Sequence, residues 1–101
     1  MSKTSSSKIE DVSINYEEDG KLLVREIGKK ILSRGAWATI IFLYQEYDRA
    51  KDKYKPAKVS LRRYQKKGGD FVARSKFVIS NEKQARLIAE NILEWYTCIK
   101  G

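Results

Sequence analysis

The chain has 101 residues and a formal charge of +8 at pH 7, because 21 Lys and Arg side chains outnumber 13 Asp and Glu side chains. This length corresponds to one domain with one core. The sequence has no His and a single cysteine, Cys98, which excludes histidine-based catalysis, His-ligated metals, an internal disulfide and a cysteine-rich zinc site. Glu26, Asp48 and Asp70 are scattered without a pairing pattern, so we expect no enzyme, no cofactor and no metal.

No segment has the features of a targeting or membrane sequence. Residues 1–20 lack an apolar stretch that could form a signal-peptide core, and the longest apolar run, Ala36–Tyr44, is too short to span a bilayer. We therefore expect a protein that is not secreted and has no membrane or small-molecule partner. The cytoplasm, in association with the nucleoid, or the nucleus fits a single inert Cys98.

The charge is concentrated in the middle of the chain. Residues 1–20 carry two basic and five acidic side chains (net −3), residues 21–80 carry 16 basic and five acidic ones (net +11), and residues 81–101 carry three of each. An anionic partner would therefore bind residues 21–80. We interpret residues 1–20, which are serine-rich and acidic, as a flexible tail that either has no function or competes with an anionic ligand. Residues 21–101 form a single basic domain in this interpretation.

The first half of that domain has the residue pattern of two strands and a loop. Leu22–Leu32 alternates loosely and predicts a strand with a kink at Gly28. Ala36–Asp48 is rich in aromatic and β-branched residues and predicts a central strand. The segment Arg49–Ala57 is a charged loop.

Two further strands, Lys58–Gln65 and Phe71–Ile79, are predicted on either side of the tight turn at Gly68-Gly69. In the first of them we expect three side chains to face the core: Val59, Leu61 and Arg63. The solvent face would then hold Lys58, Ser60, Arg62 and Tyr64. In the second we expect the core side to hold Phe71, Ala73, Ser75, Phe77 and Ile79, and the opposite side to hold Val72, Arg74, Lys76 and Val78.

After these strands the apolar period changes to that of a helix. Ser80 or Asn81 can cap its start, with Gln84 completing a capping box. An apolar stripe follows at helical spacing, formed by Ala85, Ile88, Ala89, Ile92, Tyr96 and Ile99. Further apolar residues beside the stripe exceed what one sheet face needs, which suggests a second copy of the helix as a partner. The expected core and dimer contacts of the helix are Ile88, Ile92, Leu93, Trp95 and Tyr96.

We therefore predict an α+β fold, in which a four-stranded curved antiparallel sheet is covered on one face by a C-terminal amphipathic helix (ββββα). The open face would collect cations and aromatic rings, which track phosphates and stack on unpaired bases. The predicted nucleic-acid-binding residues are Lys58, Arg62, Tyr64, Lys66, Lys67, Arg74, Lys76, Trp37, Lys29 and Arg34.

Other interpretations of these residues stay open. Trp37 has the residue type of a core side chain, and Tyr64 could cover a sheet edge. Lys66 and Lys67 could serve only to keep the turn in solvent. A charged alternation on a strand is also the ordinary pattern of a solvated face.

The segment from Val59 to Ile92 resembles the single-stranded-DNA-binding domain of the positive cofactor four family of transcriptional coactivators. The resemblance rests on the following motifs: Leu61-Arg62-Arg63-Tyr64, Gly68-Gly69-Asp70, Arg74-Ser75-Lys76 and Phe77-Val78-Ile79-Ser80, with weaker similarity at Glu26-Ile27-Gly28-Lys29 and Gly35-Ala36-Trp37. It implies a homodimer with a continuous groove for unpaired DNA, in which Arg62 contacts the backbone and Arg74 and Lys76 line the basic strand.

The function expected from the sequence is low-specificity binding of single-stranded DNA or RNA by a homodimer, in transcription, replication or repair. The alternative is a dimeric protein-interaction module whose basic sheet face binds an acidic protein. No feature of the sequence separates DNA from RNA.

Overall fold

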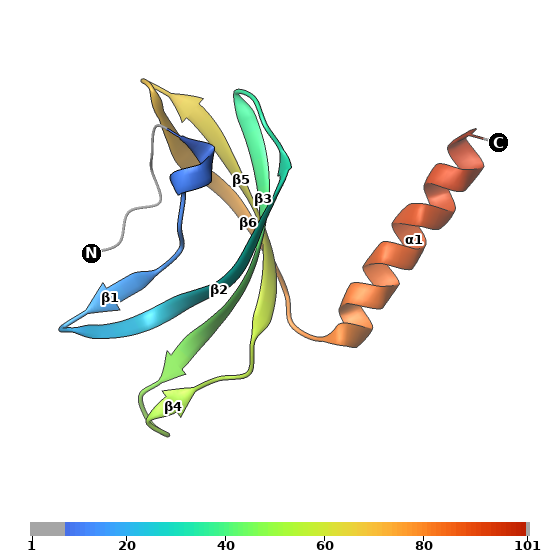
Figure 1. Cartoon of the computed structure of the whole chain (residues 1–101). Coiled ribbons are helices and arrows are strands. Elements are labelled where there is room, and N and C mark those ends of the chain that lie inside the picture. Colours follow the sequence, from blue (N-terminus) through green and yellow to red (C-terminus); the bar gives the residue numbers. More distant parts are fainter. Residues whose placement is uncertain (1–7, 101) are drawn as a thin grey trace.

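An antiparallel, strongly curled sheet takes up most of the chain (Figure 1). The computed structural model describes residues 8–100. The strands are β1 (Tyr16–Glu18), β2 (Lys21–Ser33), β3 (Trp37–Asp48), β4 (Lys53–Tyr54), β5 (Lys58–Lys67) and β6 (Asp70–Ile79). A 3-10 turn, η1 (Ile9–Asp11), precedes the sheet, and the helix α1 (Glu82–Lys100) follows it. The predicted α+β class, with a curled antiparallel sheet and one C-terminal helix, is confirmed.

The predicted number of strands is wrong. The sheet has the order β1-β2-β3-β5-β6, and β4 pairs with β3 beside this path. The two extra strands are short and lie in segments that were interpreted as a tail and as a charged loop. The four predicted strands all exist, and the kink expected at Gly28 is a register shift between Glu26 and Gly28 in the pairing of β2 with β3.

The core lies on one face of the sheet, which we call the inner face. Alternate residues of β3 point into it and are almost completely buried: Ala38, Ile40, Phe42 and Tyr44. Strand pairing places Tyr64 beside Ala38 and Ser60 beside Phe42, so these two residues of β5 are buried on the same face. The expectation that Ser60 and Tyr64 face solvent is therefore wrong.

The N-terminal segment Ile9–Ile14, here called the strap, covers part of the inner face (Figure 1). Its apolar side chains Ile9, Val12 and Ile14 are 6%, 1% and 4% exposed and belong to the core. Burial of such side chains contributes about 1.5–3 kcal/mol each. The structure thus differs from the expected flexible tail over residues 9–18, which hold η1, the strap and β1, while residues 1–7 lie outside the described part.

Three side chains of β2 and the β2–β3 turn hold the strap in place. Lys29 Nζ donates hydrogen bonds to the carbonyl oxygens of Glu10 and Val12, each at 2.6 Å. The carboxylate of Glu26 accepts hydrogen bonds from Ser13 Oγ and from the N–H of Ile14, at 2.9 and 3.3 Å. The guanidinium of Arg34 donates a hydrogen bond to Glu10, which lowers the pKa of that carboxyl, so the ion pair is lost only when the pH falls into the acidic range.

A β-bulge changes the faces of β6 midway along the strand. Arg63 pairs with Ser75 and Tyr64 pairs with Ala73, which leaves Arg74 as the extra residue. Phe71 is consequently buried in the core, whereas Phe77 lies on the outer face and is 51% exposed. The prediction that Phe71, Ala73, Ser75, Phe77 and Ile79 share one core face is therefore wrong, because the bulge interrupts the alternation.

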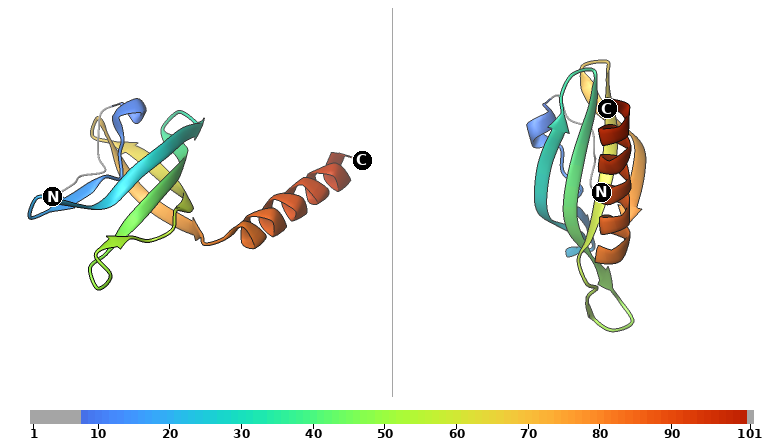
Figure 2. Two further views of the ribbon diagram at one scale, coloured as in Figure 1. Left: turned by 60° about the horizontal axis from the view of Figure 1, so that its bottom comes forward. Right: turned by 90° about the vertical axis from the view of Figure 1, so that its right-hand side faces the viewer.

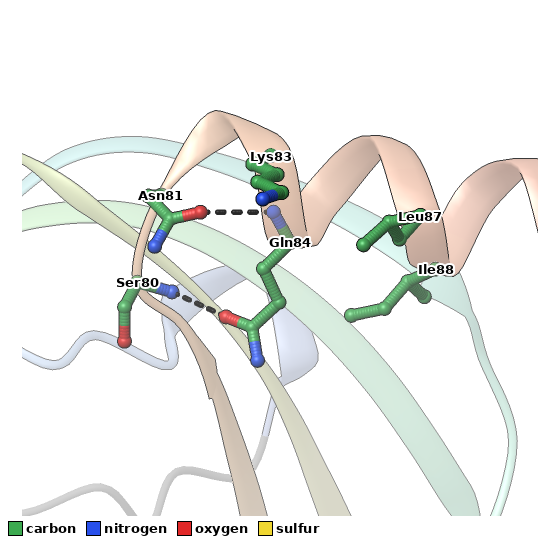
Figure 3. Close-up of a pocket in the computed structure, with 6 residues that line it drawn as sticks. All are labelled: Ser80, Asn81, Lys83, Gln84, Leu87 and Ile88. Atoms are coloured by element: carbon green, nitrogen blue, oxygen red, sulfur yellow. Dashed lines mark hydrogen bonds between the residues drawn. The ribbon is translucent and has the colours of Figure 1, made fainter.

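Helix α1 begins at the predicted capping box (Figure 3). The N–H of Gln84 donates to Asn81 Oδ1 at 2.9 Å, and the N–H of Ser80 donates to Gln84 Oε1 at 2.8 Å. From there the helix extends away from the sheet, on the side opposite to η1 (Figures 1 and 2). The predicted cover of one sheet face by this helix is not present. Ile92, Leu93, Trp95 and Tyr96 are exposed rather than in the core, and Ile88 is only half-buried.

The contacts of Lys29 predict an effect on stability. We expect Lys29→Ala to lower the free energy of unfolding by about 1.5–3 kcal/mol, because two hydrogen bonds from a charged amine to the strap are lost. Urea denaturation followed by circular dichroism measures this change. Lys30→Ala is the matched control, since Lys30 is exposed and has no partner among residues 8–100, and it should change stability by less than about 0.5 kcal/mol. Equal effects of the two variants would show that the strap is not held by Lys29.

Candidate nucleic-acid interface

The β5–β6 hairpin carries most of the unpaired positive charge of the sheet. Between residues 58 and 79 there are seven cationic side chains and one acidic side chain, Asp70. Among residues 8–100, Lys58 is the one member of this set with a carboxylate partner, Glu46, at 3.0 Å. The remaining six have none: Arg62, Arg63, Lys66, Lys67, Arg74 and Lys76. These cations are available to an anionic ligand.

Strand register places four of the seven on the inner face. Lys58, Arg62 and Lys66 lie on the same face of β5 as Ser60 and Tyr64, which are buried between them. Lys76 of β6 pairs directly with Arg62. We call these four cations (Lys58, Arg62, Lys66 and Lys76) the inner basic row. The polar contacts of the strap are with β2 and the β2–β3 turn and include no member of the row, although its apolar side chains belong to one core cluster with Tyr64 and Phe71.

Arg62 is the most fixed member of the inner basic row. Its Nε donates a hydrogen bond to Ser60 Oγ at 2.9 Å, and Ser60 itself is completely buried. The guanidinium carbon lies 5.5 Å from the centre of the Tyr44 ring and 5.8 Å from that of Phe42. These contacts orient the planar guanidinium before any ligand arrives, which reduces the entropy lost on binding.

Lys58 and Lys66 are also held by neighbouring groups. The carboxylate of Glu46 accepts a hydrogen bond from Lys58 and raises the pKa of that amine, so Lys58 stays charged until the pH rises into the strongly alkaline range. Lys66 Nζ lies 5.5 Å from the centre of the Phe71 ring. Neighbouring groups therefore restrain the positions of both amines.

The outer face holds a second, smaller group of polar side chains. The guanidinium of Arg63 lies 4.8 Å from the centre of the Trp37 ring, which is 43% exposed. Arg74 Nε donates to Gln65 Oε1 at 3.0 Å. Trp37 and Arg74 were predicted to share a surface with Arg62, but the bulge and the register place them on the opposite face. Arg63 was assigned to the core, because alternation alone does not say which face is buried.

Three of the predicted binding residues are already used by the fold. Tyr64 is fully buried, so its ring cannot stack on a base. Lys29 and Arg34 bind the strap. Lys67 lies next to the turn at Gly68 and Gly69 (φ +61° and +89°) and is exposed, as expected.

No metal or membrane feature accompanies these cations. Within residues 8–100, no three His, Cys, Asp or Glu side chains are grouped so that they could hold a metal ion. The one helix of that part is not apolar enough over its length to cross a membrane.

Comparison with protein-family models, with curated proteins and with solved structures gives no match for this chain. The ligand of this protein is therefore inferred from its own side chains and their arrangement.

Burial of Tyr64 predicts the effect of removing its hydroxyl. Burial raises the pKa of this phenol, and its oxygen has no hydrogen-bond partner among the described residues. We expect Tyr64→Phe to leave the free energy of unfolding unchanged or to raise it by about 1 kcal/mol, because an unsatisfied buried hydroxyl is removed. Tyr64→Ala should lower it by about 3–5 kcal/mol. Chemical denaturation compares the two, and a similar large loss in both variants would mean that the hydroxyl is bonded.

Proposed function

We propose that this protein binds single-stranded nucleic acid along the inner basic row and acts as a homodimer. The observation that carries the first part is the row itself: Lys58, Arg62 and Lys66 on one face of β5, with Lys76 beside Arg62. Eight residue steps separate Lys58 from Lys66, and at about 3.3 Å per residue the row extends over roughly 26 Å. This is long enough to contact several successive phosphates.

The surroundings of the row favour a single strand over a duplex. Proteins that read duplex DNA commonly insert a helix or a strand ribbon into a groove. Here the helix has exposed apolar residues and no excess of charge, since residues 81–101 carry three basic and three acidic side chains. The inner face is curled and bordered by the strap, which suits a flexible strand that can bend into it (Figure 1).

Burial of the aromatic rings determines how such a strand would be bound. The inner-face rings of Phe42, Tyr44, Tyr64 and Phe71 are at most 5% exposed, so they offer no stacking platform. The guanidinium plane of Arg62 is the one flat group in the row that a base could stack on. Binding should therefore depend mostly on phosphate contacts, with little sequence preference and a strong dependence on salt. The resemblance to the positive cofactor four family supports the same class of ligand.

The second part of the proposal rests on helix α1. Six large apolar side chains on the helix are between 48% and 73% exposed: Leu87, Ile92, Leu93, Trp95, Tyr96 and Ile99. Most helical stability in proteins comes from packing of an apolar face, and this helix has almost no packing within its own chain. The outer face of the sheet exposes further apolar side chains, among them Leu43 and Phe77.

A second copy of the chain would bury the apolar side chains of both surfaces at once. The unpacked helix and the outer face lie on the same side of the sheet (Figure 2). Two copies related by a two-fold axis can therefore bury their helices against each other and against the partner's outer face. The net charge of residues 81–101 is zero, so helices from two copies of this basic chain meet without repulsion.

The proposed ligand predicts a salt-dependent loss of affinity in one double variant. We expect Arg62→Ala with Lys76→Ala to weaken binding of every single-stranded oligonucleotide alike. The slope of log K against log salt should fall by about 1.4, which corresponds to two lost phosphate contacts. Fluorescence anisotropy at several salt concentrations measures both the affinity and its salt slope. Lys30→Ala with Lys53→Ala removes the same charge from exposed positions outside the row and is the control. Stronger binding of duplex than of single strands, or a slope near zero, would refute the proposal.

The proposed dimer predicts the mass of the protein in solution. The wild type should sediment at twice the chain mass of 11.7 kDa. We expect Ile92→Glu, which places a charge in the apolar stripe, to yield monomers, whereas Lys83→Glu places a carboxylate on the opposite side of the helix and should leave the dimer intact. Analytical ultracentrifugation distinguishes the two masses, and a monomeric wild type would exclude the homodimer.

A further inference from the structure

We propose that a hollow at the Lys58 end of the inner basic row binds a further phosphate group of the same nucleic-acid strand. The inference rests on the proposed function and extends the binding path beyond the sheet. The hollow has a volume of about 390 Å³ and lies between the β3–β5 connection and the start of α1. Three lysines line it: Lys51, Lys55 and Lys58.

The lysines of the hollow are positioned by an ordered loop. The phenol of Tyr54 donates to the carbonyl oxygen of Leu22 at 2.7 Å and ties the loop to β2. The N–H of Lys55 donates to the carbonyl oxygen of Glu46 at 2.8 Å, and Gln45 Nε2 donates to the carbonyl oxygen of Lys55 at 3.2 Å. Because the backbone N–H and C=O of Lys55 are both bonded, the loop holds Lys55 where it lines the hollow together with Lys51 and Lys58.

The acidic side chain that lines the hollow is bonded within its own turn. Asp48 also lines it, but Asp48 Oδ1 accepts hydrogen bonds from the N–H groups of Ala50 and Lys51, at 3.0 and 3.3 Å, so this carboxylate is part of the turn. Glu46 is paired with Lys58. Lys51 and Lys55 have no carboxylate partner among residues 8–100.

The chemistry of the hollow matches a phosphate on an extended chain. Lysine amines are compact charges with three donors each, and they bind phosphate without requiring a fixed orientation. Ser80 lines the same hollow and adds a hydroxyl, and Pro56 and Ala57 add apolar surface. Lys58 belongs to both the inner basic row and the hollow, so a strand that follows β5 from Lys66 to Lys58 reaches the hollow without leaving the protein surface.

A comparison of oligonucleotide lengths tests this extension. The test variant is Lys51→Ala with Lys55→Ala, and the matched control is Lys30→Ala with Lys53→Ala, because it removes the same charge from two exposed lysines that do not line the hollow. Affinities for oligothymidylates of increasing length are measured by anisotropy. On the long ones we expect the test variant to lose roughly three- to tenfold in affinity, as two solvated ion contacts disappear, and its salt slope to fall by about 1.4. On the shortest oligonucleotide that the wild type still binds, the variant and the wild type should agree.

The outcomes separate this inference from the function on which it rests. A wild type that binds no oligonucleotide overturns the proposed function. Equal affinities of the test variant and of Lys30→Ala with Lys53→Ala at every length, with intact wild-type binding, overturn the hollow alone. Inorganic phosphate is the second probe: if it shifts the backbone amide resonances of residues 51–55, 57 and 58 and a long oligothymidylate does not, the hollow binds a free anion instead of the strand. Should the alanine pair unfold, Lys51→Gln with Lys55→Gln repeats the measurement with similar side-chain length.

Discussion

The burial of the strap against the inner face is the interaction on which the rest of this structure depends. A curled sheet needs an apolar cover on its core face, and in this chain the helix does not supply one. Ile9, Val12 and Ile14 do so instead, held by Lys29, Glu26 and Arg34. Loss of any one of these buried side chains would cost about 1.5–3 kcal/mol, which is a large fraction of the net stability of a small domain. The strap is therefore a part of the core.

The contacts of the strap also decide which cations of the inner face remain available to a ligand. Beside β2 the face is occupied by the strap, and two cations, Lys29 and Arg34, bind it rather than a ligand. Beside β6 the face carries the inner basic row, whose best-fixed member is Arg62. The same packing that completes the core hides the aromatic rings. It thereby determines that a nucleic acid would be bound through its phosphates more than through its bases.

Local motifs in the sequence predicted local structure. The face of the sheet on which a side chain lies, and its burial, depend instead on contacts between distant segments. Gly68-Gly69 and the Asn81 and Gln84 pair specified a turn and a helix start, because each motif satisfies backbone requirements within a few residues. Tyr64 lies on the inner face because it pairs with Ala38 of another strand. Both faces of β5 are partly apolar, so the alternation of residues along β5 could not show which of its faces is buried. The bulge at Arg74 and the three spaced apolar residues of the strap leave no periodic signal in the sequence. Only part of the candidate site, Lys58, Arg62, Lys66 and Lys76, could therefore be predicted as one surface.

The free edges of the sheet affect how the chain behaves at high concentration. Unpaired edge strands are templates for uncontrolled strand addition and aggregation. At one edge β1 is three residues long and covers only the start of β2, while farther along β2 the backbone N–H of Glu26 donates to Asn15 Oδ1 and its carboxylate accepts from the N–H of Ile14. At the other edge β6 is longer, but the bulge interrupts its regular ladder and Arg74 and Lys76 place charges along it. The irregularity that makes the faces of β6 hard to predict thus also interrupts the ladder that a further strand would need in order to pair along this edge.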